Sequence, residues 1–184
     1  MSAGHGHGVE QHGGNKRVAL LIAVLALILA FAETLGKGAQ TGALAYNIEA
    51  SNLWAFFQAK TIRQTVLRTA AEEVEAGGAS EAQKKQAAKW KDTAQRYQSE
   101  PETGEGREQL AARAKEAEKK RDTSMAAYHH YEVASAAVQI AIVLASASII
   151  AEIIALAWVG GALGAIGVAF CVIGFFFPTA VHLF

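Results

Sequence analysis

The feature that most constrains the fold is a long stretch without proline or glycine, from Arg107 to Trp158. It begins as a charged, alanine-rich helix, REQLAARAKEAEKKRDTS, and continues into an apolar run that starts at Val133. At about 1.5 Å per residue the stretch would form a helix about 78 Å long, whereas a bilayer core takes up only about 20 residues. The sequence therefore predicts one helix whose second half lies in lipid and whose first half stands in water.

The charges are segregated along the chain. All 17 Lys and Arg residues lie between Lys16 and Arg121, so the last 63 residues contain none. Together with a hydrophobic content of 52%, this distribution is typical of a membrane protein. The first apolar segment is not expected to be a cleaved signal peptide, because Phe31–Leu35 is a poor cleavage site. The single cysteine, Cys171, excludes a disulfide framework.

We predict an all-α membrane protein with three transmembrane helices and an extramembrane helical hairpin, coiled-coil-like, inserted between the first and the second. The predicted parts are a disordered His- and Gly-rich tail (1–17), transmembrane helices (18–37, 133–158 and 162–178), a lateral or tilted amphipathic helix (43–76) and the hairpin (80–132) with its turn at 99–106.

Three glycines, Gly36, Gly38 and Gly42, are expected to end the first transmembrane helix. The two arms of the hairpin have matched lengths of about 29 Å, which returns the chain at Ser80 to the membrane. The helix over 43–76, about 50 Å long, must then begin and end near one surface. We therefore expect it to lie along the membrane, or strongly tilted to it, and to reach neighbouring subunits. The alternative of one arm over 43–98 would overshoot the stalk by roughly 40 Å.

Aromatic side chains gather in the extramembrane part, where they suit a membrane interface or an oligomer contact. The predicted contact residues are Tyr46, Trp54, Phe56, Phe57, Trp90 and Tyr97.

The carboxyl-terminal end is predicted to be a tight helical hairpin with its turn at Gly160-Gly161. Small residues recur on one face of each of its helices, and such faces allow close packing in a membrane. These packing residues are Gly160, Gly164, Gly167, Cys171 and Gly174 on the last helix and Ala141, Ala145 and Ser148 on the preceding one.

Three runs carry a family resemblance: NIEASNLWAFFQAKTIRQT (47–65), SEPETGEGREQL (99–110) and QIAIVLASASI (139–149) followed by WVGGALGAIG (158–167). With them the chain resembles the bacterial Domain of Unknown Function 4337 family over about residues 16–174. The resemblance implies a bacterial inner-membrane protein, and it implies no activity and no catalytic residues.

Two carboxylates lie in apolar segments and are candidates for function. Glu33 and Glu152 should differ by about 20 Å in depth, so they cannot form a pair. We predict structural ion pairs, Glu33 with Lys37 and Glu152 with Arg17, and keep a proton or ion path as the alternative.

Histidines offer weak candidates for a metal site. His5, His7 and His12 lie in the tail, for which disorder is the preferred interpretation. His129 and Glu132 could share a metal, but a di-metal bundle needs repeated carboxylate and histidine sets, so an interfacial belt with Tyr128 and Tyr131 is favoured. We predict no metal and no cofactor. We also predict no nucleic-acid partner, because acidic residues interrupt the basic ones.

The sequence thus predicts a non-enzymatic, multi-pass protein of the bacterial inner membrane that forms a homo-oligomeric scaffold. Its partners would be the lipid bilayer, further copies of itself and possible other membrane proteins. The alternatives are a channel or transporter that uses Glu33 or Glu152, and an accessory subunit of a larger membrane complex. Basic residues near the membrane, Lys37 and those at 115–121, favour a cytoplasmic hairpin over a cytoplasmic amino terminus.

Overall fold

The computed structural model describes residues 8–181 and is entirely helical in its regular structure. Its four helices are α1 (Gly8–Ala76), α2 (Glu81–Gln98), α3 (Arg107–Ala151) and α4 (Ile154–Phe176). Three of them, α1, α3 and α4, are long and apolar enough to cross a membrane. The prediction of an all-helical chain with three such helices is confirmed.

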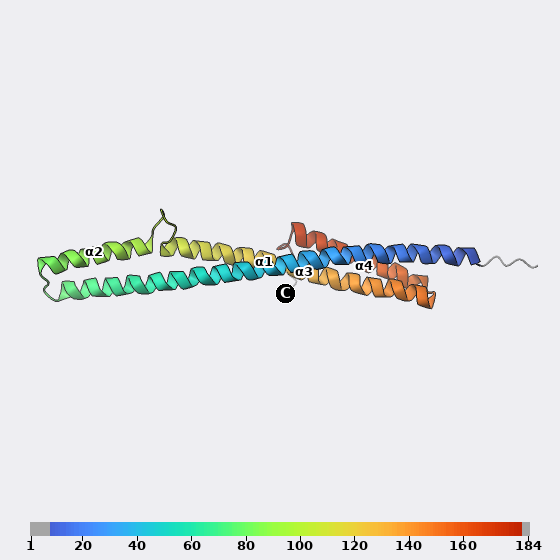
Figure 1. Cartoon of the computed structure of the whole chain (residues 1–184), viewed down its shortest axis with the longest axis horizontal. Helices are drawn as coiled ribbons and strands as arrows, with labels where there is room; N and C mark the ends of the chain where they lie inside the picture. The colour runs from blue at the N-terminus through green and yellow to red at the C-terminus, as the bar shows by residue number, and fades with distance from the viewer. Residues whose placement is uncertain (1–7, 182–184) are drawn as a thin grey trace, which may run out of the picture. The chain divides into compact units, whose positions relative to one another are not determined.

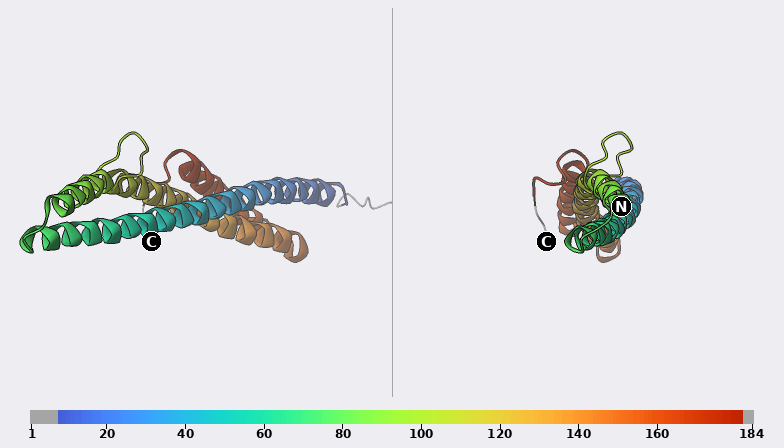
Figure 2. Two further views of the ribbon diagram at one scale, coloured as in Figure 1. Left: turned by 60° about the vertical axis from the view of Figure 1, so that its left-hand side comes forward. Right: turned by 90° about the vertical axis from the view of Figure 1, so that its left-hand side faces the viewer.

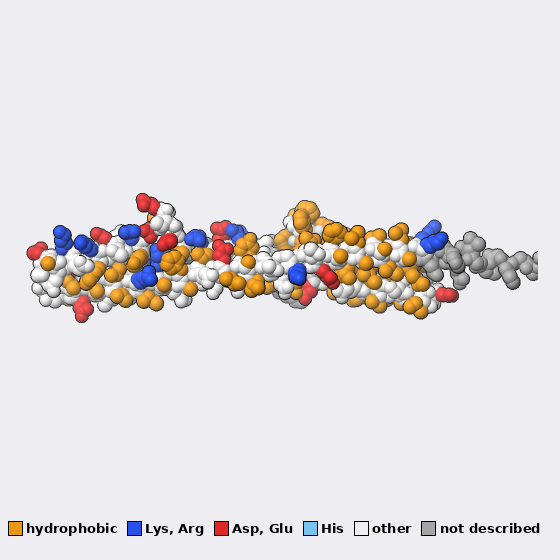
Figure 3. Space-filling view, in the orientation of Figure 1, with side chains coloured by type: hydrophobic (Ala, Val, Ile, Leu, Met, Phe, Trp, Pro, Cys, Tyr) orange, Lys and Arg blue, Asp and Glu red, His pale blue; other side chains and the backbone are white. Residues whose placement is uncertain are grey.

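The chain divides into two compact units (Figure 1). The charged unit is Leu44–Arg121, and it holds 14 of the 17 Lys and Arg residues and 12 of the 17 Asp and Glu residues. The apolar unit takes Ala43 and the residues before it, together with Asp122 and the residues after it. In the space-filling view, hydrophobic side chains cover the visible face of the apolar unit, whereas charges are spread over the other (Figure 3).

The predicted break after the first apolar segment is wrong, because α1 continues through Gly36, Gly38 and Gly42. A glycine costs a helix interior about 1 kcal/mol relative to alanine, and tertiary packing overrides that cost here. A Cβ on Gly36 would lie 3.3 Å from Tyr131 Cβ, so this glycine lets α3 approach closely. No turn therefore separates residues 43–76 as a lateral helix. The predicted disordered tail 1–17 is also wrong from Gly8 onward, where α1 begins.

In the charged unit, α2 and the start of α3 lie one after the other along α1, both antiparallel to it (Figure 2). Ion pairs and hydrogen bonds follow this order: Lys91 Nζ to Glu75 at 2.7 Å, Gln64 to the Ala94 carbonyl at 3.0 Å, and Trp54 Nε1 to Glu118 at 2.8 Å. The predicted hairpin of 80–98 with 107–121 is thus replaced by a pairing of both segments with α1. The prediction that these two segments pair with each other is therefore wrong.

The reversal from α1 to α2 uses glycine where the backbone requires it. Gly78 has φ +73°, in the left-handed region that glycine adopts without cost. Ser80 then caps α2 through a capping box, in which its side chain accepts from the Gln83 backbone and the Gln83 side chain accepts from the Ser80 backbone.

In the apolar unit, α4 returns along α3 after a turn at Glu152-Ile153. The predicted turn at Gly160-Gly161 is wrong, since both glycines lie inside α4. Glu152 has φ +57°, and a charged side chain is better solvated at a helix end than within an apolar helix.

The glycines of α4 allow close contact with the other two helices of the apolar unit. A Cβ on Gly160 would lie 2.8 Å from the Ala141 carbonyl oxygen, and one on Gly164 would lie 2.4 Å from Leu25 Cδ2. On α3 the facing residues are small and buried, namely Ala134, Ala141, Ala145 and Ser148. Small residues are the usual means by which membrane helices approach closely.

We expect Gly160→Ala to destabilise the apolar unit by about 1–3 kcal/mol, because the new methyl group would overlap the backbone of α3. Gly161→Ala is the matched control, since a Cβ at Gly161 meets nothing within 4 Å. It should be neutral or stabilising by up to about 1 kcal/mol. Thermal unfolding in mild detergent, followed by circular dichroism, measures the difference. Equal effects at the two positions would contradict this packing.

Candidate functional site

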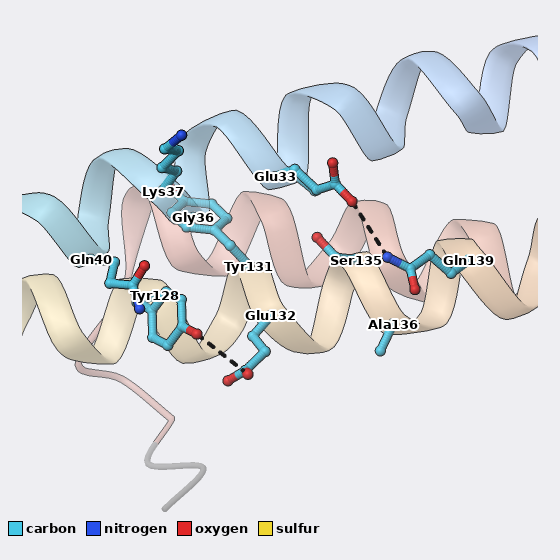
Figure 4. Close-up of a pocket in the computed structure, with 11 residues that line it drawn as sticks. Glu33, Gly36, Lys37, Gln40, Tyr128, Tyr131, Glu132, Ser135, Ala136 and Gln139 are labelled. Carbon is cyan, nitrogen blue, oxygen red and sulfur yellow. Dashed lines mark hydrogen bonds between the residues drawn. The ribbon is translucent and has the colours of Figure 1, made fainter.

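A polar groove lies in the apolar unit between α1 and α3, with a volume of about 470 Å³ (Figure 4). Its polar lining residues are Glu33, Lys37, Gln40, Tyr128, Tyr131, Glu132, Ser135 and Gln139. The groove exists because α1 and α3 approach each other at Gly36 and Tyr131, beside which the longer side chains leave space.

The carboxylates of the groove accept hydrogen bonds from neutral partners. Gln139 Nε2 donates to Glu33 Oε1 over 3.4 Å, and Tyr128 Oη donates to Glu132 Oε1 over 3.4 Å. His129 Nδ1 lies 3.6 Å from Glu132 Oε2. The predicted ion pair of Glu33 with Lys37 is not formed, because the Glu33 side chain turns toward Gln139 on α3 (Figure 4).

The second predicted ion pair, Glu152 with Arg17, is also absent from the described part of the chain. Both side chains are exposed, and Glu152 occupies the turn between α3 and α4 instead of an apolar helix. The prediction that Glu152 lies within an apolar helix is therefore wrong. Glu33 and Glu132, which both line the groove, are the carboxylates that the fold brings together.

His130 is buried beside the groove, with 1% of its surface exposed. Its Nε2–H donates to the Pro178 carbonyl over 3.2 Å, and its ring stacks on Phe170 with the centroids 6.1 Å apart. Tyr131 is also buried, at 4%. These two residues pack against Gly174 of α4, so the predicted interfacial belt is replaced there by a helix contact.

The histidine candidates of the amino terminus lie where the structure describes no side chains. His5 and His7 lie outside the described residues, and His12 lies in the first turns of α1. Among the residues that the structure describes, no group of three or more His, Cys, Asp or Glu side chains could hold a metal ion.

A second polar cluster lies in the charged unit, beneath the loop 99–106. Lys60 is only 4% exposed, and its Nζ lies 3.5 Å from Glu100 Oε2 and 3.7 Å from Glu105 Oε2. The same ammonium lies over the rings of Phe56 and Tyr97, at 5.4 and 5.5 Å from their centroids. Its desolvation is thus offset by two carboxylates and two aromatic faces.

Gln64 joins all three helices of the charged unit at this cluster. It is 2% exposed, donates to the Ala94 carbonyl of α2 over 3.0 Å, and accepts from Arg107 Nη1 of α3. The Arg107 guanidinium also lies over the Phe57 ring at 4.9 Å. The cluster fixes the point at which α2 ends and α3 begins.

The loop itself closes on its own ends, as in a compact Ω-loop. Gln109 accepts from the Glu100 backbone over 3.2 Å and donates to Ser99 Oγ over 3.1 Å. A Cβ on Gly106 would lie 2.3 Å from the Glu100 nitrogen, so only glycine fits between the two ends.

Most of the predicted aromatic contacts face the chain itself. Trp54 and Phe57 pack against the buried group of Ala50, Leu53, Leu110, Ala114 and Ala117. Phe56 and Tyr97 flank Lys60. Tyr46 and Trp90 are half-buried, as is Cys171 of α4.

These observations define an all-helical protein with three helices that could span a membrane and a charged helical unit between them in the sequence. The family described as Domain of unknown function (DUF4337) matches residues 14–177, and the chain belongs to it. No curated protein and no solved structure matches the chain. Two of the runs that carry the resemblance, 47–65 and 99–110, meet at the Lys60 cluster.

We expect Gln64→Leu to lower the free energy of unfolding by about 1–3 kcal/mol, because the Ala94 carbonyl and Arg107 lose a buried partner. Gln58→Leu is the control, since Gln58 is exposed on the same helix. Urea unfolding of the full chain in detergent measures both variants. An unchanged midpoint for Gln64→Leu would show that the cluster does not fasten the three helices.

Acid should loosen the charged unit through Glu100. Its hydrogen bond from Arg96, at 2.8 Å, is the main cause that holds the pKa of Glu100 below its ordinary value of 4.5. Because the pKa is lowered on folding, the stabilisation is present above about pH 4.5 and is lost as the pH falls below it.

Glu100→Gln should therefore flatten the dependence of the unfolding midpoint on pH below about 4.5. Part of the dependence should remain, since Lys120 likewise lowers the pKa of Glu116. Thermal unfolding between pH 3 and 6, on the order of three pH units around that value, makes the comparison. The same slope in both proteins would contradict a role for Glu100.

Proposed function

We propose that this protein is an integral membrane protein of the bacterial inner membrane whose copies assemble into a non-enzymatic scaffold. The outer surface of the apolar unit carries the proposal. Large apolar side chains are exposed on all three of its helices, including Leu27 at 59%, Val143 at 65% and Trp158 at 77%. Such a surface is unfavourable in water and favourable in lipid.

The depth of the apolar unit fits a bilayer. α4 has 23 residues, about 34 Å of helix, which compares with a hydrocarbon core of about 30 Å. The charged side chains of this unit lie toward the ends of its apolar segments, with Lys16, Arg17 and Glu152 flanking one side and Glu33, Lys37 and Glu132 the other.

Buried polar groups of the charged unit, such as Lys60 and Gln64, bind protein partners. A catalytic site needs polar groups that converge on space for a substrate. The groove at Glu33 and Glu132 offers two carboxylates without a metal set or an activated nucleophile. A scaffold accounts for such a distribution better than an enzyme does. The cytoplasmic side is proposed for the charged unit, because of its basic residues next to the apolar segments.

The groove favours a channel or transporter as the second candidate. In one copy the polar lining ends at Gln139, and the three helices then meet through apolar clusters around Leu25, Val138 and Ala141 and around Val18, Ala145 and Ala157. A conducting path would have to lie between copies. It would require that Glu33→Gln or Glu132→Gln change ion flux in proteoliposomes.

We expect the full chain, extracted in mild detergent and reconstituted in lipid nanodiscs, to give a discrete mass of several copies in native mass spectrometry. Gly161→Ala, which should leave the fold intact, serves as the reference for an unperturbed assembly. A monomer in both environments would overturn the scaffold. A defined second protein that stays bound would point to an accessory subunit.

A further inference from the structure

The charged half of α1 carries two lines of residues with heptad spacing, on opposite faces of the helix. The inner seam faces α2 and α3 and consists of Ala50, Leu53, Phe57, Lys60, Gln64, Leu67, Ala71 and Val74. The outer seam follows the same alternation of three and four residues and consists of Ala45, Ile48, Asn52, Ala55, Ala59, Ile62, Val66 and Thr69. Heptad spacing of this kind is the pattern by which one helix packs along another.

The large apolar residues of the outer seam are exposed in the described chain. Ile48 is 52% exposed, Ile62 65% and Val66 60%. This differs from the exposed apolar surface of the other unit, because the charged unit holds most of the chain's Lys, Arg, Asp and Glu residues. Lipid therefore explains the apolar unit and does not explain this seam. A regular apolar line on a charged helix indicates a protein partner.

We propose that two copies of this chain pair in parallel along the outer seam, with the two Asn52 side chains facing each other. This inference rests on the proposed function, and it names the surface and the direction of the contact. A second copy is the occupant that the seam itself specifies, since equal heptad lines on two identical helices are complementary in register.

Asn52 fixes the direction of the pair. In a parallel pair each residue of the seam lies opposite its own copy, so the two Asn52 amides can donate to and accept from each other. In the antiparallel pair that overlaps the two seams, Asn52 would lie opposite Ile62, and its amide would be buried without a partner, which is unfavourable. An asparagine at one core position is a known device for setting register and direction.

The charges beside the outer seam permit the parallel pair. In that arrangement Glu49 lies beside Leu44 of the other copy, and Arg63 lies beside Gln58. No like charges meet across the contact. Two copies inserted in one membrane in the same sense would also present α1 in the same direction, because α1 runs on from the apolar unit without a break.

Disulfide cross-linking of the full chain in nanodiscs tests the proposal. In a Cys171→Ala background, Asn52→Cys, Ala59→Cys and Val66→Cys each place one thiol on the same edge of the seam. A disulfide needs Cα atoms closer than about 7 Å, which a parallel pair provides at all three positions. Arg68→Cys is the control, since Arg68 is exposed on the same helix away from the seam. We expect covalent dimers with cysteine at 52, 59 or 66 and none with cysteine at 68.

The other outcomes overturn the proposal in distinguishable ways. A dimer at one of the three positions without dimers at the other two would contradict a parallel pair in register. An equal yield of covalent dimer at position 68 would show that copies collide at random and have no fixed contact. No dimer at any position, with a mass of several copies in the same nanodiscs, would move the contact elsewhere and leave the scaffold intact. No dimer together with a monomeric mass would overturn both the parallel pair and the proposed scaffold.

A second variant separates assembly from folding. Ile48→Glu combined with Ile62→Glu should abolish the Ala59→Cys dimer, because two carboxylates would enter the seam of each copy. Its helix content and unfolding temperature should stay at those of the parent, since both side chains are exposed. Arg68→Glu, a charge change of the same helix off the seam, should leave the dimer in place. A retained dimer in the double variant would overturn the proposal.

Discussion

A helix of 69 residues such as α1 depends on cover from other helices. Isolated helices are marginal in water even when their residues are good helix formers, and α1 also contains Gly36, Gly38 and Gly42 in its middle. In the charged unit, 18 residues of α2 and the 15 residues 107–121 of α3 cover the 33 residues of α1. In the apolar unit, the later part of α3 and α4 do so. The continuity of α1 is a consequence of these contacts and not of helix propensity.

The contrast between tertiary contacts and helix propensity also explains which features the sequence could predict. The apolar segments, the loop 99–106 and the small-residue faces follow from residue type and spacing, and the structure places Gly160, Gly164 and Gly167 against neighbouring helices. Glycine has two meanings that spacing alone does not separate. At Gly78 it turns the chain, with φ +73°, whereas at Gly36 and Gly160 it remains helical and admits a neighbour. The predicted breaks at the latter two positions were wrong for this reason.

The Lys60 cluster was not predicted, although the sequence contains a signal for it. Lys60 and Gln64 occupy the inner seam of α1, where spacing requires buried residues. Polar residues at such positions need partners, because a buried unpaired charge is costly. The charged partners, on the loop and at the start of α3, lie 40 or more residues further on, and no local pattern identifies them. The similar lengths of 80–98 and 107–121 instead predicted that these two segments pair with each other.

On the proposed pairing, the inner and outer seams assign folding and assembly to different faces of α1. At the inner seam, Lys60 and Gln64 bind residues of α2, the loop 99–106 and α3 of the same chain. These contacts fix the positions of α2 and α3 along α1. At the outer seam, Ile48, Ile62 and Val66 are more than half exposed, so they add little to the stability of their own chain. Residues without shared partners contribute independently. On the proposed pairing, a copy can therefore complete its fold before it meets another copy through the outer seam.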